Sequence, residues 1–339
     1  MKLISYLCLP VLIALCSGCA EKSTVTESDV IFDIGRYPFA IEHNGKYFYT
    51  MQNERCDSII LYSATEIADI ASSPGKVIFT SSDRDMHNFY SPEIHRFDNR
   101  WYIYFEADDG NTDNHQIYVL ENPAESPMAG EWTLHGPIIT NSDWNFGIHP
   151  TTISVADRRY LLWSGWPKRR TESETQCIFI AEMADPWTLR SERVMISMPQ
   201  YEWERQWINP DGSRSAYPIF VNENPEAFIS PDGRNVVVCY SASGIWTIFN
   251  TIGMLYAPVG SDLLDPRSWT KLPEPQFTHD QESGIFGSSN ITIVPSHDNT
   301  RHFLLYQAKH ATPTDSIIND IRIREIAWSD RGLPLFTPL

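Results

Sequence analysis

Three features of the sequence predict an all-β fold, a five-bladed β-propeller. Short apolar runs rich in aromatic and β-branched residues recur along the chain, and each follows a turn that contains Asn or Asp. These units recur at roughly fifty to seventy-five residues, which is the scale of a propeller blade with long loops. No long stretch has the apolar period of about 3.6 residues that marks an amphipathic helix, so we expect few helices.

The five runs are expected to be the second strands of β-hairpins, because a tight Asx-containing turn opens each of them. They span residues 46–49, 100–105, 159–163, 236–240 and 302–306. Another β-rich run precedes each, as at 91–97 and 151–155. Five similar hairpins favour a propeller over a β-sandwich.

A Trp-containing signature after three of the hairpins predicts the outer strands of blades. It reads Trp132-Thr133, Trp187-Thr188 and Trp269-Thr270. Each follows its hairpin at a distance that lets a further strand close the unit. We therefore expect one propeller domain over residues 31–339 with a central funnel.

The composition narrows the range of partners. The chain has 339 residues with 26 Lys+Arg against 43 Asp+Glu, a formal net charge of −17. It is 42% hydrophobic and 12% aromatic, which excludes an intrinsically disordered chain. An acidic surface repels phosphate backbones, so we expect no nucleic-acid partner. Neutral, hydroxyl-rich oligosaccharides or polysaccharides are indifferent to the charge and suit the surplus of Trp and Tyr.

Residues 1–18 read as a signal peptide. Lys2 is followed by an apolar run over 7–15 that is too short to span a bilayer. Small residues directly before Cys19 resemble a bacterial lipobox, so we expect Cys19 to carry a lipid; an ordinary secretory signal is the alternative. Residues 19–30 would be a tether. The protein is then an exported lipoprotein of the outer membrane, touching the membrane only through its anchor.

The remaining cysteines are expected to be unpaired. Cys56, Cys177 and Cys239 cannot all pair with one another, and two of them lie in apolar strand-like runs, which favours buried thiols. No cluster of Cys and His suggests a zinc site. A monomer is expected because propellers expose few strand edges.

Several motifs resemble glycoside hydrolase family 43, in its α-L-arabinofuranosidase and β-xylosidase branch. They are Y-S-P-E-I-H (90–95), R-W-Y-I-Y-F (100–105), L-W-S-G-W (162–166), V-N-E-N-P (221–225) and C-Y-S-A-S-G (239–244). The resemblance runs from about residue 36 to about residue 310. It implies a five-bladed propeller and an inverting glycosidase that acts on plant-type polysaccharide side chains.

The resemblance assigns the general acid to Glu223, which sits in the family's "N-E-x-P" setting. The family's base lies in "R-D-P-F", where this chain has Tyr37, and its pKa-tuning carboxylate lies in "A-I-D-G", where this chain has His149. A histidine of "G-P-G-H-N", which often helps to hold calcium or water, is replaced by Asn290. Calcium would follow from the resemblance alone, and Asn290 argues against it. We expect no metal among the site residues.

These replacements leave three hypotheses open: a non-standard base, a tyrosine nucleophile, and loss of hydrolysis. A tyrosine with a pKa of about 10 is not an ordinary base near neutrality. The base could instead come from Asp33, Asp143, Glu226 or His149. Alternatively, Tyr37 could be a nucleophile, as in sialidases. In the third, hydrolysis has been lost and the protein is a catalytically inactive glycan-binding propeller lipoprotein.

The expected sugar site combines aromatic and polar side chains, because aromatic faces stack on sugar rings and polar groups read the hydroxyls. The substrate-binding candidates are Phe39, His87, Tyr90, Glu93, Phe146, Trp166 and Asn290, together with Tyr37. His95 is a further candidate for reading hydroxyls. A turn-rich segment over 207–220 is expected to be an insertion beside the acid loop.

Overall fold

The computed structural model describes residues 29–81, 85–169, 174–206, 219–245, 247–278, 285–309 and 319–336. The predicted signal peptide, Cys19 and nearly all of the 207–220 insertion lie outside these residues. Among the described residues, no helix has the length and apolar character needed to cross a membrane.

The first two blades are four-stranded antiparallel sheets. Blade 1 consists of β2 (Phe39–Glu42), β3 (Tyr47–Gln52), β4 (Ser58–Ala64) and β5 (Lys76–Thr80). Blade 2 consists of β6 (His87–Phe97), β7 (Arg100–Asp108), β8 (Gln116–Asn122) and β9 (Thr133–Ile138). In both, the strands pair in chain order, as a meander of hairpins requires.

The next two blades share one sheet. Blade 3 consists of β10 (Ile148–Val155), β11 (Arg158–Gly165), β12 (Glu174–Asp185), β13 (Thr188–Leu189) and β14 (Val194–Ser197). Blade 4 consists of β15 (Ile219–Ile229), β16 (Asn235–Ala242), β17 (Thr251–Pro258) and β18 (Thr270–Lys271). A parallel contact between the starts of β12 and β15 joins the two blades.

The last blade contains both ends of the described chain. Blade 5 consists of β19 (Phe286–Pro295), β20 (His302–Lys309), β21 (Asn319–Trp328), β22 (Pro334–Leu335) and β1 (Asp29–Phe32). The helical elements of the described residues are short 3₁₀ turns: η1 (Ile67–Ser72), η2 (Thr112–Asn114), η3 (Glu202–Glu204) and η4 (Pro266–Ser268).

The strand predictions are confirmed. The five predicted runs fall on β3, β7, β11, β16 and β20, the second strand of each blade. The three Trp-containing signatures lead into β9, β13 and β18, each of which begins at the Thr of its signature. Local turn and strand chemistry is therefore sufficient to predict where these strands lie.

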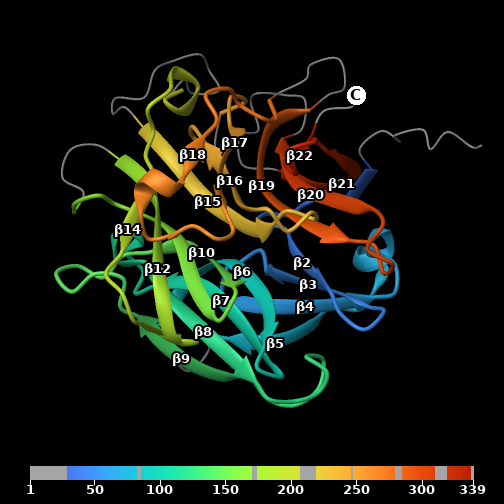
Figure 1. Cartoon of the computed structure of the whole chain (residues 1–339). Coiled ribbons are helices and arrows are strands. Elements are labelled where there is room, and N and C mark those ends of the chain that lie inside the picture. The colour runs from blue at the N-terminus through green and yellow to red at the C-terminus, as the bar shows by residue number, and fades with distance from the viewer. Residues whose placement is uncertain are drawn as a thin grey trace, which may run out of the picture.

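The innermost strands close into a ring. β2 contacts β6, β6 contacts β10, β10 contacts β15, β15 contacts β19, and β19 contacts β2. Figure 1 shows these strands around the middle of the molecule in chain order, from blue to red. β1 pairs antiparallel with β21, so the start of the chain completes the last blade. This ring is a five-bladed β-propeller and not a β-sandwich.

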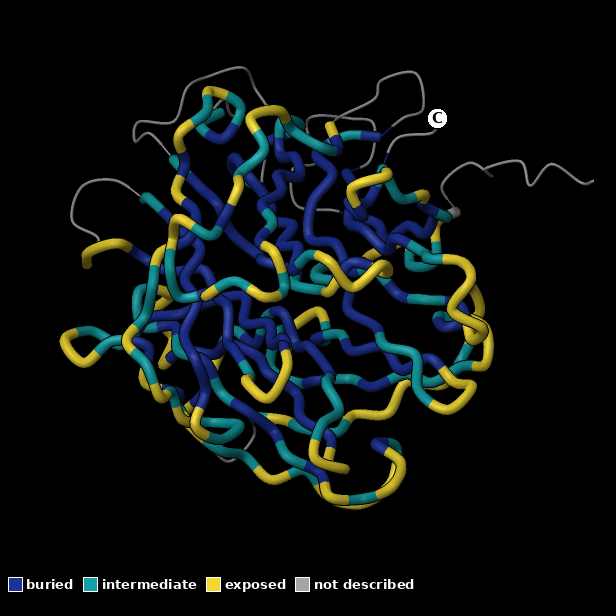
Figure 2. Tube along the Cα trace, in the orientation of Figure 1, coloured by how far each residue is buried: buried dark blue, intermediate teal, exposed yellow. Residues whose placement is uncertain are grey.

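The hydrophobic core is divided into clusters that each join two neighbouring blades. One cluster lies between blades 1 and 2, and others follow between 2 and 3, 3 and 4, 4 and 5, and 5 and 1. Trp101 and Trp163 are completely buried in two of them. Figure 2 shows the buried residues along the strands and the exposed ones at the peripheral turns. Cys177 and Cys239 are buried, as expected, whereas Cys56 is half-buried, and all three are free thiols.

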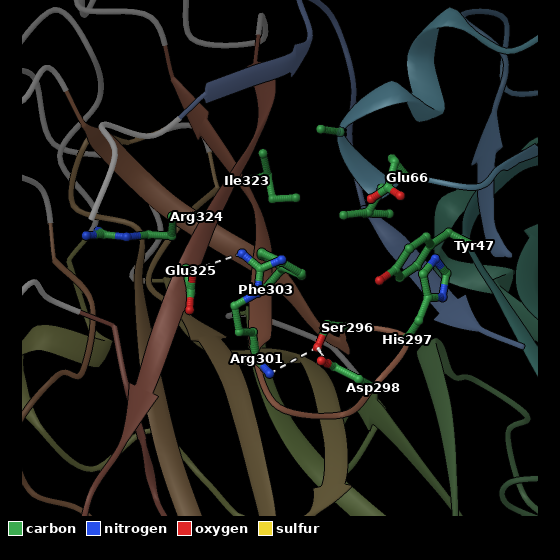
Figure 3. A pocket seen from close by; sticks show the side chains of 12 residues that line it. Tyr47, Glu66, Ser296, His297, Asp298, Arg301, Phe303, Ile323, Arg324 and Glu325 are labelled. Atoms are coloured by element: carbon green, nitrogen blue, oxygen red, sulfur yellow. Dashed lines mark hydrogen bonds and ion pairs between the residues drawn. The ribbon is translucent and has the colours of Figure 1, made fainter. Parts of the chain in front are cut away.

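A pocket of about 460 Å³ lies at the seam between blades 1 and 5 (Figure 3). Tyr47, Phe303 and Glu325 contribute to its walls. The guanidinium carbon of Arg301 lies 5.2 Å from the Phe303 ring centroid, and Arg301 also approaches a carboxylate oxygen of Glu325 at 3.7 Å. In the described part of the chain, none of the site residues predicted from the sequence lines this pocket, so the candidate site lies elsewhere.

Candidate active site

Each innermost strand has a residue with positive φ within it or, in the case of β2, shortly before it. These residues are Tyr37 (φ 52°), Ser91 (46°), His149 (52°), Asn224 (51°) and Asn290 (47°), and we call them the bulge layer. In β6, β10, β15 and β19 they coincide with breaks in the pairing register. Positive φ is unfavourable for Tyr and His, and such strain gathers where side chains must be aimed at a functional site.

The second strand of one blade supports the bulge of the next. The backbone N–H of His149 donates to Glu106 Oε2 at 3.1 Å, and the N–H of Asn224 donates to Ser164 Oγ at 2.9 Å. In the same way, the N–H of Asn290 donates to Ser241 Oγ at 2.9 Å, and the N–H of Tyr37 donates to Gln307 Oε1 at 3.3 Å. The last of these bonds links blade 5 to blade 1. The bulge layer is thus held by side chains from neighbouring blades, which fixes its geometry relative to the ring.

Glu223 precedes Asn224 on β15, and its side chain is buried. The neighbouring Asn222 lies on the opposite face of the strand. There its amide nitrogen donates to Glu204 Oε1 at 2.9 Å, and its oxygen accepts from Lys271 Nζ at 3.0 Å and from Ser197 Oγ at 2.8 Å. This network therefore fixes the part of β15 that carries Glu223, from the face opposite to the Glu223 side chain.

Glu204 is the centre of that network. It pairs with Lys271 at 2.6 Å, and its Oε1 also accepts from the Tyr240 hydroxyl at 2.8 Å. Its other oxygen accepts the backbone N–H groups of Gln200 and Tyr201. Glu204 is completely buried, so the ion pair and these donors must balance the cost of removing its charge from water.

Tyr37 lies beside the two other rings of the site. Its centroid is 6.0 Å from that of Tyr90 and 5.2 Å from that of His149. Burial, followed by the negative charges of Glu223 and Glu106, raises the pKa of Tyr37 well above its ordinary value of 10. Tyr37 is therefore a neutral phenol near neutral pH, with two carboxyl groups close to it.

His149 is buried and neutral. Burial, followed by the nearby His115, lowers the pKa of His149 to about 3. Its Nε2 lies 3.7 Å from Glu106 Oε1. Among the described residues, its Nδ1 has no hydrogen-bond partner. The His149 ring thus faces the Glu106 carboxyl group with Nε2, whereas Nδ1 makes no hydrogen bond within the described part of the chain.

Glu106, at the inner end of β7, was not predicted from the sequence. It is 1% exposed, and burial raises its pKa to about 8. A signal was available, because aligning the five hairpins on one another places a polar residue after an aromatic one in every second strand. The polar residues are Thr50, Glu106, Ser164, Ser241 and Gln307, of which only Glu106 is ionisable.

Sequence reasoning also missed His115 and Asp108. The Nε2 of His115 lies 3.3 Å from Asp108 Oδ2, and its ring centroid is 5.7 Å from that of Tyr90. Both oxygens of Asp108 accept from the Asn88 amide, at 3.0 and 2.9 Å. These residues extend the polar side of the site beside Tyr90.

A second pair of carboxyl groups lies two residues further along the innermost strands. Glu93 follows Ser91, and Glu226 follows Asn224, at the same interval. Burial raises the pKa of Glu226 to about 8, and burial followed by the charge of Glu226 raises that of Glu93 well above its ordinary value. Glu226 Oε1 accepts from Thr292 Oγ1 at 2.9 Å. Two buried carboxyl groups that disfavour each other's charge are protonated near neutral pH.

The other predicted residues fall into separate surroundings. Phe39 packs in the core between blades 1 and 2, with its centroid 5.0 Å from that of His95. Phe146 and Trp166 stack on each other, with centroids 3.8 Å apart and an angle of 9° between the rings. His87 is exposed and bonds to Asp85 at 3.2 Å.

Two carboxylates considered as bases, Asp33 and Asp143, are exposed to solvent. Of the aromatic candidates, Tyr37 and Tyr90 lie together with His149, whereas Phe146 and Trp166 form a pair of their own. The contacts of the described residues thus support one compact group around Tyr37.

Asn290 stands where the resemblance would place a histidine near a calcium ion. Its Oδ1 accepts from Ser241 Oγ at 3.0 Å, and its Nδ2 donates to Gln307 Oε1 at 2.9 Å. Both ends of the amide are therefore engaged, one with blade 4 through Ser241 and the other within blade 5 through Gln307. The described residues contain no group of three or more His, Cys, Asp or Glu side chains suited to a metal. The residues present do not fit the calcium, and we derive no step through it.

The sequence of the chain matches a family model and two curated proteins. Residues 33–334 match the model of "Glycosyl hydrolases family 43". An extracellular exo-α-(1→5)-L-arabinofuranosidase of Streptomyces avermitilis and α-L-arabinofuranosidase 43 of Humicola insolens are both 30% identical to this chain. Each match covers 88% of this chain and 60% of the relative, so the chain spans about 60% of their length.

A solved structure agrees in fold over nearly the whole chain. The α-L-arabinofuranosidase of Lactobacillus brevis has a TM-score of 0.79 at 27% identity, covering 91% of this chain and 95% of that one. A thermostable family-43 glycoside hydrolase, at 19% identity and a TM-score of 0.71, shares the fold. With its family model matched from the first blade to the last, this chain belongs to glycosyl hydrolase family 43.

Proposed function

We propose that the protein is a glycoside hydrolase that removes arabinofuranoside- or xyloside-like side chains from plant-type polysaccharides, with Glu223 as the general acid. The observation that carries this proposal is the placement of Glu223. It is buried beside Tyr37, and a dense network on the opposite face of β15 holds the preceding residue. The names of the relatives, which are arabinofuranosidases, support the substrate class.

The proposed reaction is an inverting displacement. Glu223 gives its proton to the leaving oxygen while a water attacks the anomeric carbon from the opposite face. Because no carboxylate occupies positions 37 or 149, the base is non-standard, and we assign it to His149, whose buried Nδ1 has no hydrogen-bond partner among the described residues. We assign Tyr37 to the sugar-binding wall with Tyr90, because its raised pKa opposes a phenolate nucleophile.

The test is hydrolysis of a panel of arabinofuranosides and xylosides by wild type and Glu223→Gln. We expect wild type to release sugar, with inversion seen by NMR of the anomeric proton, and the variant to lose at least about 10²-fold in kcat. Retention would point to Tyr37 as the nucleophile. Saturable oligosaccharide binding in calorimetry without any product would favour the alternative, a glycan-binding protein that has lost the carboxylates at 37 and 149.

No metal enters this proposal. The Asn290 amide is engaged by Ser241 and Gln307, so we expect that dialysis against a chelator leaves kcat and the melting temperature unchanged. A loss that calcium restores would contradict this expectation.

We also propose export as a lipoprotein monomer. A relative is named as extracellular, which supports secretion, and the sequence of residues 1–18 is that of a signal peptide followed by Cys19. Radiolabelled fatty acid should be incorporated by the wild type and not by Cys19→Ser. Sedimentation of the soluble domain, residues 31–339, should give the mass of one chain.

A further inference from the structure

Glu106 is an ionisable residue at a position whose structural task does not require one. The task is to accept the backbone N–H of the next bulge, and the equivalent residues Ser164, Ser241 and Gln307 perform it with neutral groups. A fully buried carboxyl group costs more to bury than a hydroxyl or an amide. The acidic group at position 106 therefore needs another reason.

The surroundings of Glu106 supply one. One oxygen accepts the His149 N–H at 3.1 Å, and the other lies 3.7 Å from Nε2 of the same residue. Its charge also acts on Tyr37, and Tyr90 lies opposite it in the β6–β7 register. Glu106 thus faces both positions at which this chain lacks a carboxylate.

Its burial limits what Glu106 can do directly. With 1% of its surface exposed, it lies behind the bulge layer and does not reach a sugar placed against Tyr37. The groups through which it can act are the imidazole of His149 and the phenol of Tyr37. Of these, only the imidazole can act as a base: burial gives it a low pKa, and the negative charge of an ionised Glu106 beside it raises that pKa.

We infer that Glu106 is a positioning residue that supplies, through His149, the negative charge that positions 37 and 149 do not carry. It fixes the backbone of His149 through the N–H bond and lies 3.7 Å from Nε2, from where its charge stabilises the imidazolium that forms when His149 accepts a proton from the attacking water. This inference rests on the proposed function, and it adds Glu106 as the residue that supports the proposed base, His149.

The proton balance of the step is complete. Before reaction, Glu106 is a carboxylate, His149 is neutral with its proton on Nε2, and Glu223 is protonated. The water oxygen bonds to the anomeric carbon as the bond to the leaving oxygen breaks; Glu223 gives its proton to that oxygen, and the water gives one to His149 Nδ1. The imidazolium then pairs with Glu106 until it releases its proton to solvent, and solvent returns a proton to Glu223, so that both groups regain their starting states.

The pair requires the ionised form of Glu106, so the rate should rise with pH as that carboxyl group loses its proton near pH 8. An ionised neighbour favours the protonated imidazole, which makes His149 a stronger base than it is beside a neutral carboxyl group. The titratable groups that face Glu106 are His149 with His115 behind it, Tyr37, Tyr90 and Glu93. Glu223 acts on Tyr37 as Glu106 does.

The experiment measures kcat and KM from pH 5 to pH 10 for wild type, Glu106→Gln, Glu106→Asp and His149→Gln, and for the double variant E106Q/H149Q. We expect the wild-type kcat to rise through an inflection near pH 8. Glu106→Gln should lose about 10²-fold or more in kcat, keep its KM, and lose the inflection. Glu106→Asp should recover part of the rate together with the inflection.

Because Glu106 and His149 act as one unit, the double variant should be no slower than the slower single variant. Ser241→Ala, which removes the equivalent support from the Asn290 bulge, is the matched control and should keep the wild-type pH dependence. Melting temperatures of all variants separate loss of fold from loss of function.

The outcomes distinguish the two proposals. A wild type inactive on every glycoside would overturn the proposed function and this inference together. A wild type that is active and depends on Glu223, but whose kcat has no inflection between pH 7 and pH 9, would overturn the inference alone. The same holds if Glu106→Gln retains kcat, or if the double variant loses the product of the two single losses.

Discussion

Glu106→Gln should make the protein more stable at alkaline pH and leave it nearly unchanged at pH 5. The carboxyl group is fully buried, and burial raises its pKa from 4.5 to about 8 in the folded protein. Below pH 4.5 both the folded and the unfolded chains hold the proton. Between pH 4.5 and 8 only the unfolded chain releases it, so the free energy of unfolding falls as pH rises.

The magnitude follows from that interval. At about 1.4 kcal/mol for each pH unit, the wild type loses up to about 5 kcal/mol of stability between pH 4.5 and pH 8 through this one group. That is a large part of the roughly 5–15 kcal/mol that holds a typical domain together. Glutamine does not titrate, and its amide oxygen can still accept the His149 N–H.

Urea unfolding followed by Trp fluorescence at pH 5, 7 and 9 measures the effect. We expect the stability difference between E106Q and wild type to grow steadily with pH and to level off above pH 8. Glu226 has a similarly raised pKa, so the wild-type protein should keep part of its pH dependence in the variant. A variant less stable than wild type by the same amount at all three pH values would refute the reasoning, because it would mean that Glu106 is ionised and well paired in the folded state.

Three further predictions follow from particular contacts. Tyr37→Asp should raise kcat on arabinofuranosides by about 10²-fold, measured with a chromogenic substrate, because it returns a carboxylate to the base position and Asp tolerates positive φ better than Tyr; unchanged activity would mean that the base is not limiting. Glu204→Ala should cost about 3–5 kcal/mol in urea unfolding, because it leaves the charge of Lys271 buried and unpaired, and a loss below 1 kcal/mol would contradict this. Gly253→Ala should lower stability by about 1–3 kcal/mol in the same assay, because its Cβ would lie only 2.2 Å from the Tyr240 ring; an unaffected melting curve would show that the ring can move aside.

The fold was largely predictable because its information is local. Asn- and Asp-containing turns followed by alternating apolar residues determine hairpins within a few residues, and the predicted second strands lie where the structure has them. The links between blades were not predictable in this way. The pairing of β1 with β21 and the parallel contact of β12 with β15 join segments far apart in sequence, and no local pattern encodes them.

The same difference between local and long-range information separates the site residues that were predicted from those that were missed. Glu223 was found because a contiguous motif surrounds it, and Tyr37 and His149 because they interrupt motifs. Glu106 belongs to the site through a contact with His149 of the next blade, for which the aligned hairpins give only an indirect signal, and His115 belongs to it through its pairing with Asp108 and its contact with Tyr90, which no motif indicates. Even the aromatic wall was predicted by residue type alone, and the structure pairs Phe146 with Trp166 while placing Tyr37 against His149.

Repulsion between charges in a buried site explains why Tyr37, His149 and Glu106 occur together. Each buried carboxylate raises the free energy of every other one nearby, as Glu93 shows, whose pKa is raised by burial and further by the charges of Glu226 and Glu106. A carboxylate at position 37 and another at 149 would both lie beside Glu106, where their charges would keep its carboxyl group protonated. Neutral Tyr37 and His149 remove that repulsion, so that one carboxyl group behind them can ionise at moderately alkaline pH. On this reasoning the substitutions at 37 and 149 are the condition under which a carboxyl group at 106 is useful, and not simply a loss of catalytic residues.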